Sequence, residues 1–199
     1  PISLVVEGPI IMLLTASTAL AKDLFAYQKL FKYMIFMSLT LSLIHILIAF
    51  TPLFFFVAED LMNVPKSLLL PGKIGLQIMT PWTLMIAWRR LNQGVMIRHG
   101  SSNLVAIGTF IRLASLVLVL SYGRWFTSFS GIIVGASAVA IAVTAEAIYA
   151  QVAVRRILKE MSHQSIESNQ ITRKSFMKFY LPLAITPLAS LLIHPVGAA

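Results

Sequence analysis

The chain has 199 residues, of which 58% are hydrophobic and 12% charged, and this balance excludes an ordinary soluble domain, where about a quarter of residues are charged. Its formal net charge is +9, but the basic residues form short clusters between long apolar runs, which argues against a nucleic-acid partner. The absence of Cys excludes disulfides, thiolate metal sites and Cys nucleophiles. The composition therefore predicts an integral membrane protein whose outer solvent is the lipid bilayer.

Six apolar runs approach the roughly 20 residues that a spanning helix requires. They cover approximately residues 1–21, 33–57, 74–91, 103–122, 129–150 and 176–197. The third run is the shortest, because Pro71–Lys73 and Arg89–Arg90 bound it on its two sides. Since the runs are continuous and do not alternate every second residue, we expect an all-α, polytopic membrane bundle of about six transmembrane helices.

Lys and Arg residues are distributed unevenly among the connections between these runs. With the residues at their edges, the first, third and fifth connections carry twelve Lys and Arg residues, whereas the second and fourth carry three. Basic residues mark the cytoplasmic side of membrane proteins. We therefore expect a multi-pass protein of the cell inner membrane in which the long connection 151–175 is a cytoplasmic linker. This linker would separate five helices in residues 1–150 from a sixth in residues 176–199.

Glu7 is the first of four ionisable residues predicted inside the runs. Gly8 and Pro9 follow it, and because Pro lacks an amide donor and clashes with the preceding turn, the helix should bend near Glu7. A broken helix with a carboxylate at the bend is a recurrent ion or substrate site in transporters. We expect Glu7 to bind a proton or cation.

Arg112 and Glu146 fall inside consecutive predicted helices, at depths that differ by about 8 Å at 1.5 Å per residue. An extended Arg side chain covers most of that difference, so the two residues are expected to be neighbours. The pair is open to two interpretations: a buried structural ion pair that fixes helix register, or a gate or coupling pair. Glu146 shares a helix face with Ala142 and Ala138, which indicates a helix partner and not lipid.

His45 lies in the middle of the second run, and both a hydrogen-bonded core residue and a proton relay remain open for it. The other histidines are dispersed, so the sequence predicts no metal site, and no cofactor motif or catalytic constellation is present. The chain is therefore not expected to be an enzyme. Gly131 and Gly135 form a Gly-x-x-x-Gly pair, which predicts close helix packing.

Three segments carry a resemblance to a known superfamily. They are residues 81–100 (PWTLMIAWRRLNQGVMIRHG), residues 7–20 (EGPIIMLLTASTAL) and residues 45–50 (HILIAF). Together they resemble the multidrug/oligosaccharidyl-lipid/polysaccharide exporter superfamily, and within it bacterial relatives of the multidrug and toxic compound extrusion transporters and the progressive ankylosis family. The resemblance implies two lobes of six spans, with the first five runs here as spans two to six of the first lobe, and we expect the chain to be cut at both ends.

Arg89 and Arg90 lie within the longest of these segments, at the predicted inner end of the third run. Two interpretations are open. The pair could be an ordinary positive-inside anchor with Trp88 at the interface. Alternatively, one arginine could face a central cavity and meet an anionic substrate.

We therefore expect a secondary active transporter that exports a small-molecule or anionic solute by alternating access, coupled to a proton or sodium gradient. Glu7, His45 and Arg112 are the expected cavity-facing polar groups, with Glu146, Arg89 and Arg90 as further candidates. The alternative from another class is a non-transporting membrane scaffold or assembly subunit, whose polar groups merely lock helices together. A membrane-embedded transferase would need an acid or His cluster at one interface, and the sequence shows none.

Overall fold

The computed structural model describes residues 10–163 and 173–193. In this part of the chain the structure is all-α, as the sequence predicts. The elements are α2 (Leu13–Leu20), α3 (Leu24–Phe50), α4 (Leu53–Phe55), the π-helix η1 (Phe56–Leu61), α5 (Lys66–Ile78), α6 (Trp82–Arg98), α7 (Ser102–Phe126), α8 (Gly131–Ser162) and α9 (Arg173–Ile193). Three of them, α3, α7 and α8, are long and apolar enough to cross a membrane.

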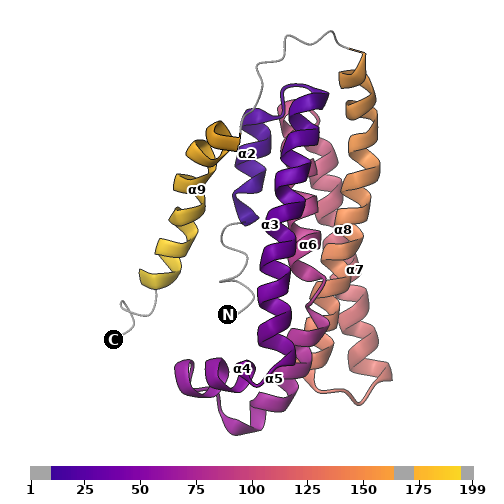
Figure 1. The fold of residues 1–199 in the computed structure, drawn as a ribbon. Coiled ribbons are helices and arrows are strands. Elements are labelled where there is room, and N and C mark those ends of the chain that lie inside the picture. Colours follow the sequence, from indigo (N-terminus) through magenta and orange to yellow (C-terminus); the bar gives the residue numbers. More distant parts are fainter. Residues whose placement is uncertain (1–9, 164–172, 194–199) are drawn as a thin grey trace.

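The long helices run up and down a bundle, and their connections alternate between its two ends (Figure 1). The turns 21–23 and 99–101 and the end of α8 lie at one end, which we call the basic end. The elements α4, η1 and α5 and the turn 127–130 lie at the opposite end. This alternation agrees with the division of connections used to count charge in the sequence.

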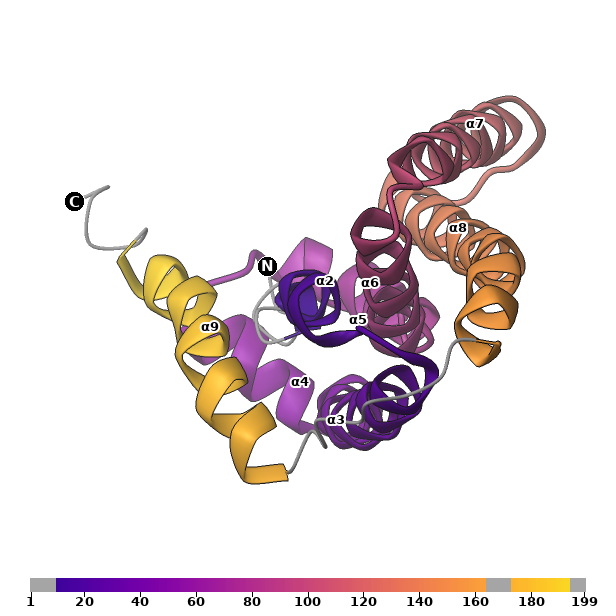
Figure 2. The same ribbon diagram turned by 90° about the horizontal axis from the view of Figure 1, so that it is seen from above.

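Helix α6 is the centre of the bundle. Seen from above, it lies between α2, α3 and α8, with α7 outside α8 and α9 on the far side of α2 (Figure 2). Its residues Leu91 and Val95 are fully buried in the main apolar core, together with Leu13 of α2 and Val154 of α8. On the side of the bundle where α9 lies, the ring of Phe176 in α9 stacks on the ring of Tyr33 in α3, with 4.7 Å between the ring centroids.

The third predicted run, 74–91, is not one helix. It is divided between α5 and α6 by the turn 79–81, because Pro81 cannot continue a hydrogen-bonded helix and disfavours helical geometry at Thr80. The second run, predicted over 33–57, likewise ends as α3 at Phe50, two residues before Pro52, where Thr51 is extended. Pro residues within apolar runs therefore set both boundaries.

All five predicted connections are partly helical, and α5 begins at Lys66 and contains Pro71, so Pro71 does not bound the third run as predicted. Helix α3 begins at Leu24, where the side chain of Asp23 accepts a hydrogen bond from the Ala26 amide at 2.7 Å, so the predicted loop 22–32 is mostly its first turns. Helix α8 continues to Ser162, so the first twelve residues of the predicted linker 151–175 are helical. They stay helical because Val154, Ile157 and Met161, spaced three and four apart, bury one face in the core.

Helices α6 and α2 approach each other closely at Gly94. A Cβ at this position would lie 2.5 Å from the carbonyl oxygen of Leu14 and nearer still to the Ser17 hydroxyl. Only a residue without a side chain fits there. By contrast, no atom of the described residues lies within 4 Å of a Cβ built on Gly131 or Gly135, so the close packing predicted for this glycine pair is not seen in that part of the chain.

Large apolar side chains cover the outer faces of the long helices. On α7, Phe110, Leu118 and Trp125 are exposed, the last of them 76% exposed, and Phe36 on α3 is exposed in the same way. Such extended apolar surfaces are too large for a water-facing protein and are consistent with contact with a lipid bilayer.

Candidate functional site

A charged residue stands at the centre of α8. Glu146 is fully buried and lies about halfway along this helix, roughly 22 Å from each end at 1.5 Å per residue. Its Oε2 accepts a hydrogen bond from Arg89 Nη1 at 2.6 Å, and its Oε1 accepts one from Gln93 Nε2 at 2.9 Å. Because Arg89 and Gln93 are four residues apart on α6, both project from one helix face toward Glu146.

A second arginine reaches the same carboxylate from α7. Arg112 Nε lies 3.3 Å from Glu146 Oε2, which confirms that these two residues are neighbours, as the sequence analysis expected. Gly108, one turn before Arg112, lies against the same part of α8, where a Cβ would be 3.2 Å from the Tyr149 ring and 3.5 Å from Glu146 Cγ. We call Arg89, Gln93, Arg112 and Glu146 the charge cluster.

In the charge cluster, as far as the structure describes the chain, two guanidinium groups approach one carboxylate. Arg89 is only 4% exposed, whereas the side chain of Arg112 is 37% exposed. A buried charge is tolerated when it is paired and hydrogen-bonded, and Glu146 meets this condition through both of its oxygens. Arg112 is therefore the most exposed charged residue of the cluster.

Arg89 and Arg90 do not lie at a helix end. They are the eighth and ninth of the seventeen residues of α6, which extends to Arg98, so the interpretation of Arg89 as an interfacial anchor is wrong. The sequence placed them at an end because polar residues follow immediately. The structure instead buries Asn92 and Gln93 against α8, which lets the helix continue. Arg90 is partly buried beside this surface.

A polar network that the sequence did not predict joins α6 to α8 and α3. Gln151 Oε1 in α8 accepts hydrogen bonds from Trp88 Nε1 at 2.7 Å and from Asn92 Nδ2 at 2.9 Å. Asn92 Oδ1 in turn accepts a hydrogen bond from the Tyr27 hydroxyl of α3 at 3.2 Å. The spacing of Trp88 and Asn92, four residues apart, was the available signal for a shared helix face.

His45 is a buried, hydrogen-bonded residue. Its Nε2 lies 2.9 Å from the carbonyl oxygen of Leu76, in the last turn of α5. The last carbonyls of a helix lack intrahelical partners, and the amide of Thr80 bonds Gln77 and not Leu76. A carbonyl can only accept, so Nε2 must carry the proton. His45 therefore ties α3 to the end of α5, as a core residue does.

Arg98, the last residue of α6, caps the C-terminal end of α2. Arg98 Nη1 donates to the carbonyl oxygens of Thr18 at 2.7 Å and Ala19 at 3.0 Å, and a cation suits the negative end of a helix dipole. Arg98 therefore has a local structural role. Glu7 and the expected bend at Pro9 lie outside the described residues.

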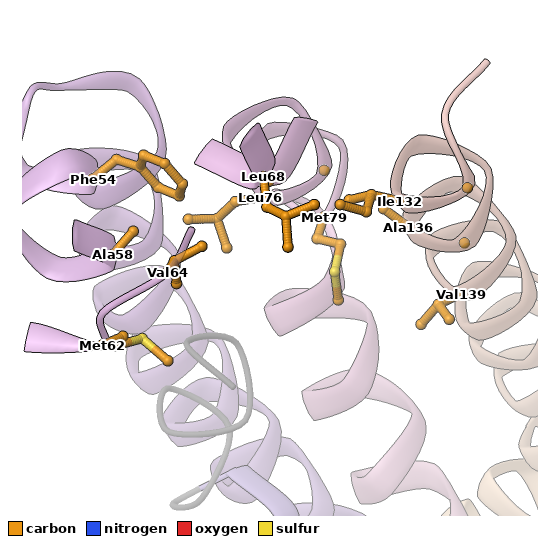
Figure 3. Close-up of a pocket in the computed structure, with 14 residues that line it drawn as sticks. Phe54, Ala58, Met62, Val64, Leu68, Leu76, Met79, Ile132, Ala136 and Val139 are labelled. Carbon is orange, nitrogen blue, oxygen red and sulfur yellow. The ribbon is translucent and has the colours of Figure 1, made fainter. Parts of the chain in front are cut away.

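The opposite end contains an apolar pocket with a volume of about 450 Å³. Figure 3 shows Phe54, Met62 and Val64 on one side and Ile132 and Val139 of α8 on the other. The pocket also lies against Gly131 and Gly135, which explains the empty space beside these glycines. None of the charge-cluster residues lines it.

Among the described residues, no group of three or more His, Asp or Glu side chains is arranged to hold a metal ion. The chain matches no family model, and neither a curated protein nor a solved structure is significantly similar to it. The charge cluster is thus the arrangement from which a function has to be argued.

Proposed function

We propose that the chain belongs to a secondary active transporter, which moves a solute by alternating access coupled to a proton or sodium gradient. The observation that carries this proposal is the charge cluster at mid-length of α6, α7 and α8. A charge at the centre of a membrane helix costs about 2.5 kcal/mol or more, and such residues commonly mark ion or substrate pathways. Helices α7 and α8 both have the length and apolarity of membrane spans.

The geometry supports an anionic solute as the cargo. Arg89 and Gln93 already satisfy both oxygens of Glu146, so Arg112 could turn toward an anion without leaving the carboxylate unpaired. Its partial exposure provides the access. In the mechanism we propose, Arg112 exchanges between Glu146 in the empty state and the solute in the loaded state.

The resemblance to the exporter superfamily extends the proposal. We propose six spans, of which α3, α7 and α8 are complete single helices, while α5 with α6 forms an interrupted one. The remaining two would include α2 and α9. Residues 151–175 would then join two lobes on the cytoplasmic side of the inner membrane, and Glu7 would be a coupling acid that binds a proton or sodium ion.

One observation favours the alternative of a non-transporting scaffold. Both oxygens of Glu146 are engaged by side chains from α6, which is the arrangement of an ion pair that locks two helices in register. His45 and Arg98 also bond backbone carbonyls, as locking residues do. A scaffold would need these contacts and no solute.

Transport by the full-length protein in proteoliposomes tests the proposal. With a proton or sodium gradient imposed, we expect accumulation of radiolabelled phosphate or succinate, with ethidium as the probe for an amphipathic cation. Arg112→Gln should lower anion uptake at least tenfold while leaving the thermal unfolding temperature nearly unchanged. Glu7→Gln should abolish the dependence on the gradient. If none of the three probes accumulates and the variants change stability alone, the scaffold is the better description.

A further inference from the structure

A groove runs between α3 and α8 near the basic end of the bundle. Both helices pack on α6, which forms the floor, while they barely meet each other (Figure 2). The resulting cavity has a volume of about 310 Å³. Its lining residues are Tyr27, Gln28, Phe31, Lys32, Trp88, Gln151 and Leu158.

Three of the side chains that line the groove, Tyr27, Trp88 and Gln151, are held in a fixed orientation by the polar network. The carbonyl oxygen of Gln151 already accepts from both Trp88 and Asn92, so toward a ligand this side chain offers its NH₂ donors. The hydroxyl of Tyr27 is directed at Asn92, which leaves the aromatic ring for the cavity. The lining of the groove therefore combines aromatic surface with hydrogen-bond donors, and these donors favour a ligand that is rich in acceptors.

The charge around the groove is positive. Lys32 lines the α3 wall and is exposed. On the α8 wall, Arg155 is exposed and lies four residues after Gln151 and three before Leu158, which places it on the same helix face. None of the described residues that line the cavity is acidic. The site therefore suits an anion that is held by an ammonium from one wall and a guanidinium from the other.

An apolar track leaves the groove along α3. Phe36, Leu39, Leu43 and Leu47 are all exposed, and their spacing of three and four residues continues the helix face of Lys32. Roughly 310 Å³ accommodates a headgroup but not a whole lipid, whose acyl chains would lie on this track. Basic and aromatic side chains next to an apolar helix face are the usual composition of an anionic-lipid site.

We propose that the α3–α8 groove binds the phosphodiester headgroup of an anionic membrane lipid, between Lys32 and Arg155, with the acyl chains along the apolar face of α3. The proposal rests on the membrane location of α3 and α8 and is independent of the transport proposal. A failure to observe transport would leave it unaffected.

Lipid binding to the full-length protein in detergent tests the proposal by native mass spectrometry and by lipid-induced thermal stabilisation. The variant K32Q/R155Q removes both cations of the groove. The matched control is K22Q/R156Q, which removes two exposed cations from the same end of the same bundle, since Lys22 is exposed and the Arg156 side chain is 90% exposed beside Glu160. Both variants therefore lower the net charge equally.

Phosphatidylglycerol should bind the wild type more tightly than phosphatidylcholine. K32Q/R155Q should weaken phosphatidylglycerol binding about 25-fold, because each basic residue near an anionic lipid contributes about fivefold. The control should change it less than about twofold. An equal loss in both variants would assign the effect to diffuse charge and overturn the proposal, as would equal binding of the two lipids. Stabilisation by soluble glycerol phosphate to the same extent would identify a free phosphate ester, not a lipid, as the ligand.

Discussion

Arg89 and Glu146 are separated by 57 residues in the sequence, yet their side chains meet with 2.6 Å between Nη1 and Oε2. Each stands near the middle of its helix, and both are buried. The pair therefore connects the centres of α6 and α8 directly. Because neither charge has access to bulk water, removal of one partner takes away a buried, charged contact of the other.

Glu146→Gln should destabilise the protein strongly. The substitution preserves the shape of the side chain but removes the carboxylate that Arg89 contacts at 2.6 Å, and breaking a buried ion pair costs about 3–5 kcal/mol. Arg112→Gln should cost about 1 kcal/mol or less, since the Arg112 side chain is 37% exposed and its charge is partly solvated. The free energy of unfolding in detergent, measured by denaturant titration, distinguishes these two effects.

The control for Glu146 is a second glutamate on the same helix. Glu160 pairs with Arg156 at 3.1 Å, but both side chains are largely exposed. Glu160→Gln should change stability by about 0.5 kcal/mol or less, as is typical of surface pairs. Equal losses for Glu146→Gln and Glu160→Gln would show that the buried charge cluster has no special role in stability.

Gly94→Ala should separate α2 from α6. The added methyl would approach the Leu14 carbonyl oxygen to 2.5 Å, and since this is a backbone atom, no side-chain rotation relieves the contact. Overpacking of this kind costs about 1–3 kcal/mol. Gly135→Ala is the matched control, because open space surrounds it and alanine favours the helix by up to about 1 kcal/mol. Opposite shifts in the unfolding temperature are expected, and a loss at Gly135 as large as at Gly94 would refute the packing argument.

His45→Ala should loosen the junction between α5 and α6. Without His45, the buried carbonyl of Leu76 loses its side-chain partner, at a cost of about 1–3 kcal/mol. Hydrogen exchange at the amides of residues 77–80 and 82 should accelerate. His99→Ala is a suitable comparison, since its contact with the Ala21 carbonyl is longer, at 3.4 Å, and lies at the exposed end. Unchanged exchange at residues 77–80 and 82 would mean that Pro81 alone fixes the junction.

The sequence predicted the ion pair between Arg112 and Glu146 because charges inside two consecutive apolar runs stand out from their surroundings. It did not predict that Arg89 is the closer partner. Hydropathy ends the third run near Arg89, whereas the helix continues by burying Asn92 and Gln93 against α8. Burial of polar residues depends on partners from distant segments, which a single helix pattern does not contain. Helix α8 extends past the predicted end of its apolar run for a different reason, since Val154, Ile157 and Met161 bury one of its faces.

The orientation of the bundle is a prediction that thiol labelling can test, since residues 1–199 contain no Cys and an introduced Cys is the single thiol within them. Ser101, between α6 and α7, lies at the basic end, and Ser128, between α7 and α8, lies at the opposite end. Because basic residues are retained on the cytoplasmic side, the basic end should face inward.

In intact cells, a membrane-impermeant maleimide should label Ser128→Cys, while Ser101→Cys should react only after permeabilisation. The two positions are separated by α7, whose 25 residues span about 38 Å at 1.5 Å per residue, enough to cross the roughly 30 Å hydrocarbon core. The reverse labelling pattern would invert the orientation and place the α3–α8 groove in the outer leaflet. Labelling of both positions in intact cells would contradict a spanning α7 altogether.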